Sequence, residues 1–200
     1  MRGVEQIPWL YDAYMALMDA VGLRQWRRWL VQGTVGRTLD LGCGTGRNLR
    51  LFPERADVVG LELDLRMAHR ARRRAPARPL VVASAESLPF KGATFQTVVS
   101  SLVFCSVTDP SEGLLEVHRV LAADGKLRML EHVRSAWAPV ARLQDLTQPL
   151  WTAVSGGCHP NRETELTVTQ AGFSIDASSR RARGSMRCFT ARPDVGDSTR

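Results

Sequence analysis

A short apolar strand that runs directly into three closely spaced glycines, LDLGCGTG at residues 39–46, constrains the fold of this chain more than any other feature. Glycine tolerates positive φ and has no Cβ, so such a loop turns sharply and lets a ligand approach the main chain. In α/β proteins, loops of this kind hold cofactors at the carboxyl ends of parallel strands. A tight strand-to-helix connection that binds nothing would give the same pattern, so the surrounding residues decide between the two.

The glycine spacing and two acidic residues narrow down the ligand. A dinucleotide-binding loop needs its third glycine where this chain has Arg47, and no Gly-Lys-Ser/Thr sequence marks a Walker loop. Asp40 would repel a pyrophosphate but attract the ammonium group of an amino acid. Glu62 lies near the end of the next predicted strand, roughly 20 residues on, where a carboxylate accepts hydrogen bonds from two ribose hydroxyls. These residues predict a cofactor that joins an amino acid to a nucleoside.

Strands and helices alternate along the chain. We expect apolar strands at residues 38–41, 58–63, 80–83, 95–101 and 126–132. Helices are expected from the glycine loop to about Phe52, and at 65–74, 112–121, 140–154 and 162–170, with Asp64 as the N-cap of the second. This order predicts right-handed crossovers in a mostly parallel sheet that has helices on both faces.

The two ends of the chain complete the expected architecture. Segments 173–179 and 185–191 are close in sequence and predict an antiparallel hairpin at the sheet edge, which gives a Rossmann-like α/β fold of seven strands. Residues 1–192 are expected to form a single domain, in which helices within 1–35 cover the active site, and 193–200 a disordered tail. The apolar face of the first helix is predicted from Leu10, Tyr14, Leu17 and Met18.

Composition limits the compartment and the partners. The four cysteines are scattered without a C-x-x-C pair, which favours a reducing cytoplasm and predicts neither a disulfide framework nor a metal site. No signal peptide and no apolar run long enough for a membrane span are evident. The net charge is +7, with arginine clusters at 24–28, 70–78 and 180–187. These clusters fit either an anionic partner, such as nucleic acid or lipid, or simply solvated helix faces.

The motifs together resemble those of the class I S-adenosylmethionine-dependent methyltransferases, from about residue 11 to 191. LDLGCGTGRN resembles the first motif of that family, and VVGLELD resembles the second, with Glu62 in the ribose-binding place. ASAESLPFKGATFQTVVSS and LLEVHRVLAADGKLRMLEH resemble the stretches that follow. Ser84 and Gln96 stand where members commonly have acids. The resemblance implies S-adenosylmethionine as cofactor and S-adenosylhomocysteine as its product.

The resemblance also implies which residues bind the cofactor. They come from the first helix, the glycine loop and the ends of strands two to four, and Ala85 and Glu86 are expected beside the adenine. The full set is Tyr11, Asp40, Gly42, Cys43, Gly44, Gly46, Asn48, Glu62, Leu63, Ala85, Glu86, Ser101 and Leu102.

Two narrower resemblances concern the methyl acceptor. YDAYMALMDAVGLRQWRRW resembles quinone C-methyltransferases, whereas LVFCSV, MLEHV and PLWTAVSGGCHPNRET are similar to membrane-associated alkyl thiol S-methyltransferases. They imply a small apolar acceptor: a thiol, a quinone or phenol, or a lipid. His132, after the fifth strand, and His159 are the candidate bases, unless they only pack or orient a loop. Trp151, Cys158 and Arg162 are candidate substrate contacts, and Cys105 is interpreted as a small buried side chain.

Several alternatives stay open at this point. The basic charge suggests an RNA methyltransferase, although the chain lacks both an Asp/Asn-Pro-Pro-Tyr motif and a Pro-Cys pair after strand four, which argues against nucleic acid. A cofactor-binding protein without catalysis is a second alternative. The five tryptophans fit a pocket wall, a peripheral membrane contact or plain packing. The sequence makes no prediction of oligomeric state.

Overall fold

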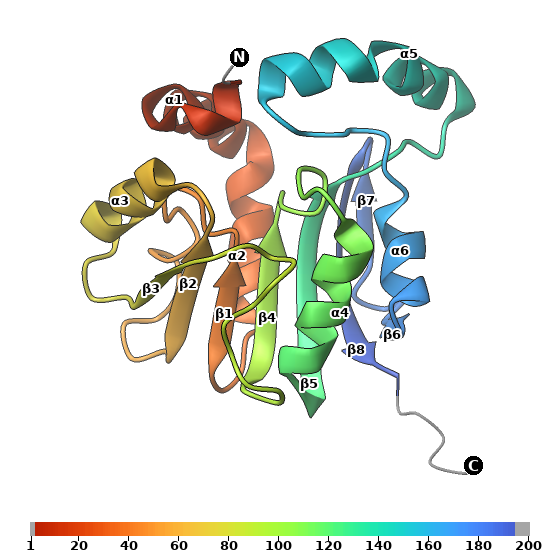
Figure 1. Cartoon of the computed structure of the whole chain (residues 1–200). Helices are drawn as coiled ribbons and strands as arrows, with labels where there is room; N and C mark the ends of the chain where they lie inside the picture. Colours follow the sequence, from red (N-terminus) through yellow and green to blue (C-terminus); the bar gives the residue numbers. More distant parts are fainter. Residues whose placement is uncertain (1–2, 195–200) are drawn as a thin grey trace.

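The central element of the protein is a twisted sheet of eight strands, described by a computed structural model that covers residues 3–194 (Figure 1). The strands are β1 (Thr38–Leu41), β2 (Val58–Glu62), β3 (Leu80–Val82), β4 (Phe95–Ser101), β5 (Leu121–His132), β6 (Phe173–Ile175), β7 (Arg181–Arg183) and β8 (Met186–Pro193). Their order is β3-β2-β1-β4-β5-β8-β6, with β7 also paired to β8. The first five strands are parallel, and β8 is antiparallel to its neighbours. The predicted Rossmann-like architecture is confirmed.

The sheet edge differs from the prediction in detail. β6 does pair with β8, but the neighbour of β8 in a tight hairpin is β7, joined to it through Gly184 at φ 57°. Positive φ at a two-residue turn matches the twist of paired strands. β7 consists of three exposed residues without apolar alternation, so no hydrophobic pattern predicted this strand. The tail prediction is wrong at Pro193, which ends β8, and its residues 195–200 lie outside the described part of the chain.

Two of the helices begin after an aspartate that caps their first turn. The helices of the described structure are η1 (Val4–Gln6), α1 (Pro8–Met18), η2 (Asp19–Leu23), α2 (Arg24–Gln32), α3 (Leu65–Arg74), α4 (Pro110–Val120), α5 (Ala138–Ser155) and α6 (Thr164–Gln170). The predicted N-cap of α3 is confirmed, because the Asp64 carboxylate accepts from the main-chain N–H groups of Arg66 and Met67. Asp109 caps α4 in the same way.

The helix expected after the glycine loop is absent from the described structure. Residues 42–52 form a series of turns, in which the N–H of Leu51 donates to the carbonyl of Asn48, three residues earlier. Leu49 and Phe52 are nonetheless buried. The apolar spacing that suggested a helix therefore arises because this irregular loop buries the same side chains. Positive φ at Gly46, 80°, turns the chain away from a helical start.

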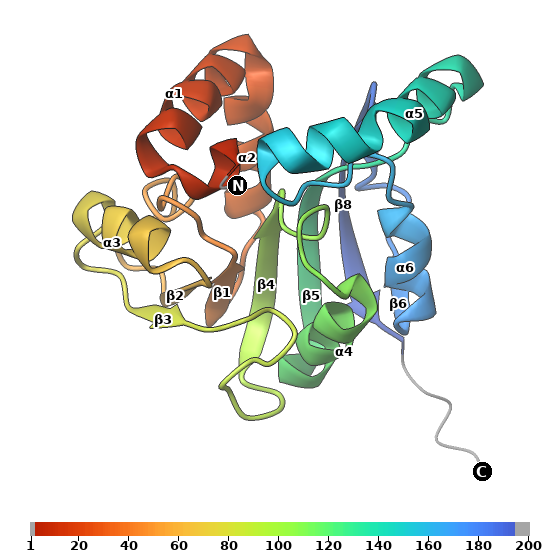
Figure 2. The same ribbon diagram turned by 45° about the horizontal axis from the view of Figure 1, so that its top comes forward.

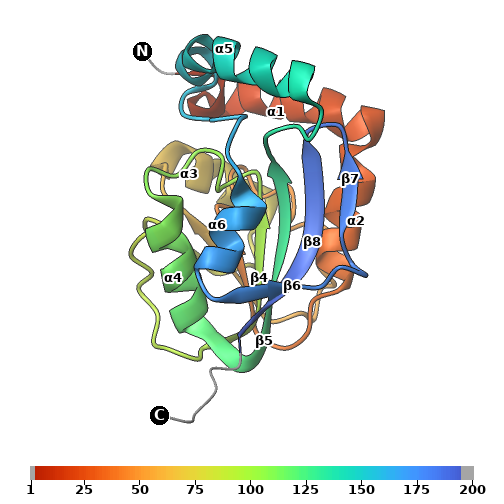
Figure 3. The same cartoon turned by 90° about the vertical axis from the view of Figure 1, so that its right-hand side faces the viewer.

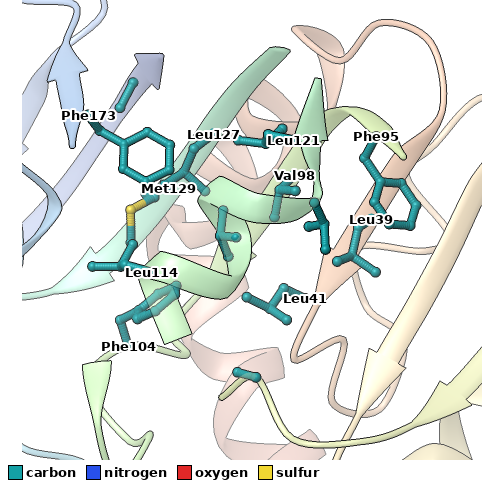
Figure 4. Packing of buried hydrophobic residues seen from close by; sticks show 14 of the residues in the cluster. Leu39, Leu41, Phe95, Val98, Phe104, Leu114, Leu121, Leu127, Met129 and Phe173 are labelled. Carbon is teal, nitrogen blue, oxygen red and sulfur yellow. The ribbon is translucent and has the colours of Figure 1, made fainter. Parts of the chain in front are cut away.

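Two hydrophobic cores lie on opposite faces of the sheet. Adjacent strand residues divide between them: Val98 and Met129 join the core under α4 and α6 (Figure 4), whereas Val99 and Leu130 join the core under α2 and α3. Figure 3 shows α2 on the opposite side of the sheet from α4 and α6. The prediction of helices on both faces is therefore confirmed.

The carboxyl ends of the parallel strands are covered by α1 and α5, at the top of Figure 1 and brought forward in Figure 2. The predicted apolar face of α1 is wrong. Its buried residues are Asp12 and Met15, while Tyr14 is 41% and Leu17 60% exposed. The reason is that α1 covers a polar loop and a cavity instead of the apolar sheet surface. Within residues 3–194, none of the helices has both the length and the apolar character needed to cross a bilayer.

A buried arginine fixes α2 to the sheet. Arg128 on β5 donates from Nε to the carbonyl of Leu30 and from Nη2 to that of Trp29, at 2.8 and 2.6 Å. These are carbonyls at the end of α2, where a cation is favourable. Its guanidinium also lies 4.0 Å from the centre of the Trp29 ring. This attachment places the inner face of α2 beside the glycine loop.

Candidate active site

A cleft of about 450 Å³ opens where β1, β2 and β4 end beneath α1. Nine of the thirteen residues predicted to bind the cofactor line it: Tyr11, Gly42, Gly44, Glu62, Leu63, Ala85, Glu86, Ser101 and Leu102. Sequence reasoning missed other lining residues, among them Gln6, Met15, Met67, Val103 and Gly156. Gln6 and Met67 lie outside the motifs quoted above, and the motifs that contain Met15, Val103 and Gly156 did not single these residues out, so the fold alone shows that they reach the cleft.

The first two glycines of the loop leave bare main chain toward this cleft. Gly42 has φ 60°, and a Cβ there would lie 2.5 Å from the Val103 side chain. Gly44 has φ 56°, and the atom nearest to a Cβ placed on it would be Tyr11 Oη, at 3.6 Å. Positive φ at both positions strains any other residue. The loop therefore presents peptide groups to a ligand, with α1 as the cover.

Glu62 combines a structural contact with free binding capacity. Its Oε2 accepts from the Gly44 N–H at 2.8 Å, and its Oε1 accepts from the Asp64 N–H at 2.9 Å. Burial raises the pKa of this carboxyl, although these main-chain N–H groups oppose the shift. Each carboxylate oxygen has a second lone pair, so two vicinal hydroxyls can still be accepted. The residue fits the ribose-binding role.

Asp40 and Asn48 lie behind the loop and do not line the cleft, contrary to the prediction. Asp40 is 0% exposed, and its Oδ1 accepts from Asn48 Nδ2 at 3.2 Å. Burial raises the pKa of Asp40 to about 7. Successive strand residues point to opposite faces, so Asp40 points toward α2, away from the core that holds Leu39 and Leu41. Asp40 therefore supports the glycine loop from behind and does not present its carboxylate to the cleft.

Cys43 and Gly46 also lie outside the cleft. Cys43 is buried in the core under α2 and α3, and a Cβ on Gly60 would lie 3.1 Å from its Sγ. A Cβ on Gly46 would lie 3.0 Å from the Cα of Ala71 in α3. The third glycine is thus required for close packing of α3 against the loop, a role that spacing alone does not distinguish from ligand binding.

Arg27 connects the loop to the helices above it, and no sequence signal identified it. It is 3% exposed. Its Nη1 donates to Asn48 Oδ1 at 2.9 Å and to Ser101 Oγ at 3.2 Å, and its Nε pairs with Asp19 at 3.2 Å. Because Asn48 in turn donates to Asp40, a chain of buried polar contacts runs from α2 to the end of β1.

Asp12 fastens α1 to the glycine loop and to α3. Its carboxylate accepts from Thr45 Oγ1 at 2.7 Å, Arg70 Nε at 2.9 Å and Arg74 Nη2 at 2.8 Å. Burial opposes ionisation, but the hydrogen bonds from Arg74, Thr45 and Arg70 outweigh it and lower the pKa of Asp12 to about 2. A polar clamp therefore replaces the apolar contact expected for α1.

The Asp12 clamp predicts a loss of stability in acid. A carboxyl whose pKa falls from 3.8 in the unfolded chain to about 2 in the folded one stabilises the fold above pH 3.8 and loses that effect as pH falls to about 2. We expect Asp12→Asn to lower the free energy of unfolding by about 2 kcal/mol at neutral pH and to have a smaller effect in acid. Urea unfolding at several pH values measures this, with the exposed Asp57→Asn as control. An equal deficit at every pH contradicts the ionic clamp.

The end of the cleft expected to hold the adenine is shaped by Glu86. Its Oε1 accepts from the N–H groups of Thr108 and Asp109 at 2.9 and 3.1 Å, and the Ser84 hydroxyl donates to its other oxygen. Ser84, which stands where the family commonly has an acid, therefore holds Glu86 in place. Ala85 is buried beside them and lines the cleft.

A second cavity of about 570 Å³ adjoins the cleft, and Met15 and Leu102 line both. Leu102 has φ 60°, a strained conformation for a leucine and one that is found at functional sites. The other walls are mostly apolar and come from α1, η2, α2, the end of β5, α5, the β7–β8 hairpin and the loops after β4 and α5. They are Tyr14, Met18, Val21, Gly22, Leu23, Trp26, Cys105, His132, Trp151, Cys158, Arg183, Gly184 and Met186. An apolar molecule in this cavity would lie next to a ligand in the cleft.

One wall of the apolar cavity holds a compact cluster of reactive side chains. His132 and Trp151 contact edge to face, with ring centres 6.5 Å apart. Hydrogen bonds with Cys105 and then His132 and Trp151 outweigh burial and lower the pKa of the Cys158 thiol. Cys105 is buried, as expected, but it also faces the cavity. Three of the predicted residues, His132, Trp151 and Cys158, are thus brought together.

His159 and Arg162 are not brought to either cavity. The His159 N–H donates to the Cys105 carbonyl at 2.7 Å, and Arg162 Nη1 donates to the Phe104 carbonyl at 2.6 Å. Both residues hold the loop after β4 from behind. Glu131, which the sequence did not single out, holds the same loop: it is fully buried and accepts from the Val103 N–H at 3.1 Å.

The five tryptophans lie in three different kinds of surroundings. Trp26 and Trp151 line the apolar cavity. Trp29 packs on a buried guanidinium 4.0 Å from its ring centre. Trp9 and Trp137 are each 67% exposed. This exposed pair lies on α1 and at the start of α5.

Comparison with known proteins agrees with this geometry. Residues 39–129 match the family described as a methyltransferase domain. The thiol S-methyltransferase TMT1B of Rattus norvegicus is 34% identical over 144 residues, which is 68% of this chain and 59% of that protein. The demethylmenaquinone methyltransferase of Thermus thermophilus is 36% identical over 132 residues, 60% of each chain. The matches thus span less than two thirds of these curated relatives.

A solved structure, that of an S-adenosylmethionine-dependent methyltransferase from Thermotoga maritima, shares the fold with a TM-score of 0.66 at 21% identity, over 84% of this chain and 88% of that one. Fold and cleft together define a Rossmann-like protein whose parallel strands end at a glycine-rich loop and at the carboxylate of Glu62. With the matched family and relatives, this places the chain in the class I S-adenosylmethionine-dependent methyltransferases.

Proposed function

We propose that this protein transfers the methyl group of S-adenosylmethionine to the sulfur of a small apolar thiol. The observation that carries the proposal is the pair of adjoining cavities, one polar at its glycine loop and one apolar, which share Met15 and Leu102. A methyl donor in the cleft and an apolar acceptor in the second cavity would meet at these two side chains. Proximity and exclusion of water are the main requirements of such a transfer.

The cleft residues fit the cofactor. Glu62 can accept from the ribose hydroxyls, the main chain at Gly42 and Gly44 can approach the amino-acid end, and Ala85 can border the adenine. The cofactor, when bound, supplies a methyl group already activated on a sulfonium. The leaving group therefore needs no acid, and the protein has only to orient the acceptor and take up its proton.

The apolar cavity favours a thiol among the three acceptor classes. A thiol of the cysteine type has a pKa of about 8.5, against about 10 for the phenol of tyrosine, and a thiolate is intrinsically very nucleophilic, so a thiol needs less help from the protein than a phenol. His132 is the residue of the cavity best suited to accept the proton that the thiol loses. The similarity to a rat protein named as a thiol S-methyltransferase supports the same choice, while the similarity to a demethylmenaquinone methyltransferase keeps a quinol as the second candidate.

A screen of acceptors tests the proposal. Radiolabelled S-adenosylmethionine is incubated with the protein and an alkyl thiol, a reduced quinone, a phospholipid or tRNA, and the labelled product is counted. Transfer to the thiol, lost when the thiol is capped beforehand, is expected. Transfer only to the quinol or lipid moves the acceptor to another class. Binding of S-adenosylhomocysteine without transfer to any of them would identify a non-catalytic cofactor-binding protein.

His132→Gln is expected to lower the rate of thiol methylation by about 100-fold near pH 7. The deficit should shrink near pH 9, because a thiol with a pKa of about 8.5 then ionises without a base. Initial rates with a thiol whose pKa is about 8.5 measure the effect across this range. His159→Gln is the matched control, since His159 lies behind the loop. A deficit that does not change with pH limits His132 to shaping the cavity.

Contact with a membrane stays a prediction. The exposed apolar side chains of α5, among them Leu146 at 80% and Leu150 at 71%, support it because they lie on the helix that contributes Trp151 to the cavity. A cavity that opens beside such a surface suits an acceptor delivered from an apolar phase.

A further inference from the structure

A third cavity, of about 540 Å³, lies beside the glycine loop and is lined mainly by arginine. Its walls come from α1 and η2, α2, the loop after β1, and the end of α3: Ala16, Asp19, Ala20, Arg24, Arg27, Arg47, Arg50, Leu51 and Arg74. Figures 1 and 2 show α1 and α3 close together at this end of the sheet. Neither Arg24 nor Arg50 lines the cleft or the apolar cavity of the proposed methyl-transfer site.

Positive charge at this cavity exceeds the negative charge that faces it. Asp19 pairs with Arg27 at 3.2 Å and Arg47 at 2.6 Å, and Asp12 pairs with Arg74 at 2.8 Å and with Arg70 at 2.9 Å. Two carboxylates thus serve four guanidinium groups, and the nearby buried Asp40 adds at most one further charge.

The two remaining arginines are free to bind a ligand. Arg24 and Arg50 are exposed at the rim and form no salt bridge within residues 3–194. Deeper in the wall, carboxylates already hold Arg47: its Nη1 pairs with Asp19 at 2.6 Å, and its Nε lies 3.4 Å from Asp12 Oδ1. The unused donors around the cavity are therefore those of the two rim arginines.

We propose that this cavity binds a phosphate ester. Guanidinium groups present several fixed N–H donors that match phosphate oxygens, and clustered arginines on separate elements can enclose a single anion. The cavity is concave and the rim residues Arg24 and Arg50 come from different segments. This favours a discrete phosphate over the extended backbone of a nucleic acid, which needs a line of contacts. The phosphate belongs either to a soluble ester or to a lipid headgroup.

The arginine cavity is physically connected to the cofactor cleft. Arg27 donates to Ser101, a residue of the cleft, and Arg47 follows the glycine loop directly. A bound anion reduces the repulsion among these guanidinium groups and so holds α1 and the loop together. Phosphate binding is therefore expected to tighten cofactor binding, and the cofactor to tighten phosphate binding by the same factor.

Direct binding tests the site without any methyl acceptor. Calorimetry at constant ionic strength measures glycerol 3-phosphate, and sedimentation measures vesicles of phosphatidylcholine with or without phosphatidylglycerol. The test variant is Arg24→Gln with Arg50→Gln, both at the rim and outside the carboxylate network. The matched control, Arg28→Gln with Arg72→Gln, removes two exposed arginines from α2 and α3 that do not line the cavity. Thermal unfolding confirms that both variants fold.

The rim variant is expected to lose about tenfold or more in affinity, and the control to keep it. Loss with glycerol 3-phosphate assigns the site to a soluble ester. Loss only with vesicles that contain phosphatidylglycerol assigns it to a headgroup. The proposal is overturned if neither probe binds, if both variants lose affinity equally, or if a single-stranded RNA binds more tightly than either probe and depends equally on both arginine pairs.

Discussion

Glu62→Ala is expected to weaken the binding of S-adenosylhomocysteine by about 100-fold or more, because two hydrogen bonds to a charged acceptor contribute about 1.5–3 kcal/mol each. The carboxylate lines the cleft, and its oxygens also hold the N–H groups of Gly44 and Asp64. Burial raises its pKa, so removing the charge relieves a desolvation cost while the two main-chain donors lose their acceptor. Isothermal titration calorimetry measures the affinity.

Two variants separate the sugar contact from a general effect on the loop. Glu62→Gln keeps one acceptor oxygen and the side-chain shape, so an intermediate loss of about tenfold is expected. Glu54→Ala removes an exposed acid from the segment before β2 and should leave the affinity unchanged. Binding by Glu62→Ala that matches the unmodified protein would show that the ribose is held elsewhere.

The cofactor half of the site could be predicted because its signals are local. Gly42, Gly44 and Glu62 each stand at the end of a strand, and parallel strands bring their ends to one edge of the sheet. Local spacing could not show which way a side chain points, however. Asp40 belongs to the same motif as Gly42, yet it is turned into the interior toward α2.

The acceptor half depends on contacts between distant segments. Met15, Leu102 and Trp151 come from α1, the loop after β4 and α5, and no spacing in the sequence relates these three residues to one another. His132 was identified only because it follows a strand. His159, two residues beyond Gly157, has the same chemistry but lies behind the loop, since the main chain there bonds to Cys105. Tertiary packing decides between two such histidines, and the sequence does not.

Arg27 and Arg28 are adjacent on α2, yet Arg27 is buried and Arg28 is exposed, a difference that the sequence does not reveal. Arg27→Met is expected to lower the free energy of unfolding by about 3–5 kcal/mol, because it leaves buried partners without their cation. Arg28→Met, on the exposed side of the same helix, should change it by no more than about 0.5 kcal/mol. Urea unfolding of the two variants measures the difference. Both variants exchange arginine for methionine on the same helix, so the exchange itself cannot account for the difference in the free energy of unfolding.

The pH dependence distinguishes an electrostatic role of Arg27 from simple loss of packing. Burial raises the pKa of Asp40 to about 7, while Arg27 and Asn48 oppose the shift. A carboxyl with a raised pKa in the folded state is most favourable to folding when protonated, so its contribution is lost as pH rises from about 4 toward 7. Without Arg27 the pKa rises further and the loss continues to higher pH. The deficit of Arg27→Met should therefore be larger at pH 8 than at pH 6, by about 1 kcal/mol per unit of additional pKa shift. A deficit equal at both values would mean that the arginine acts through packing alone.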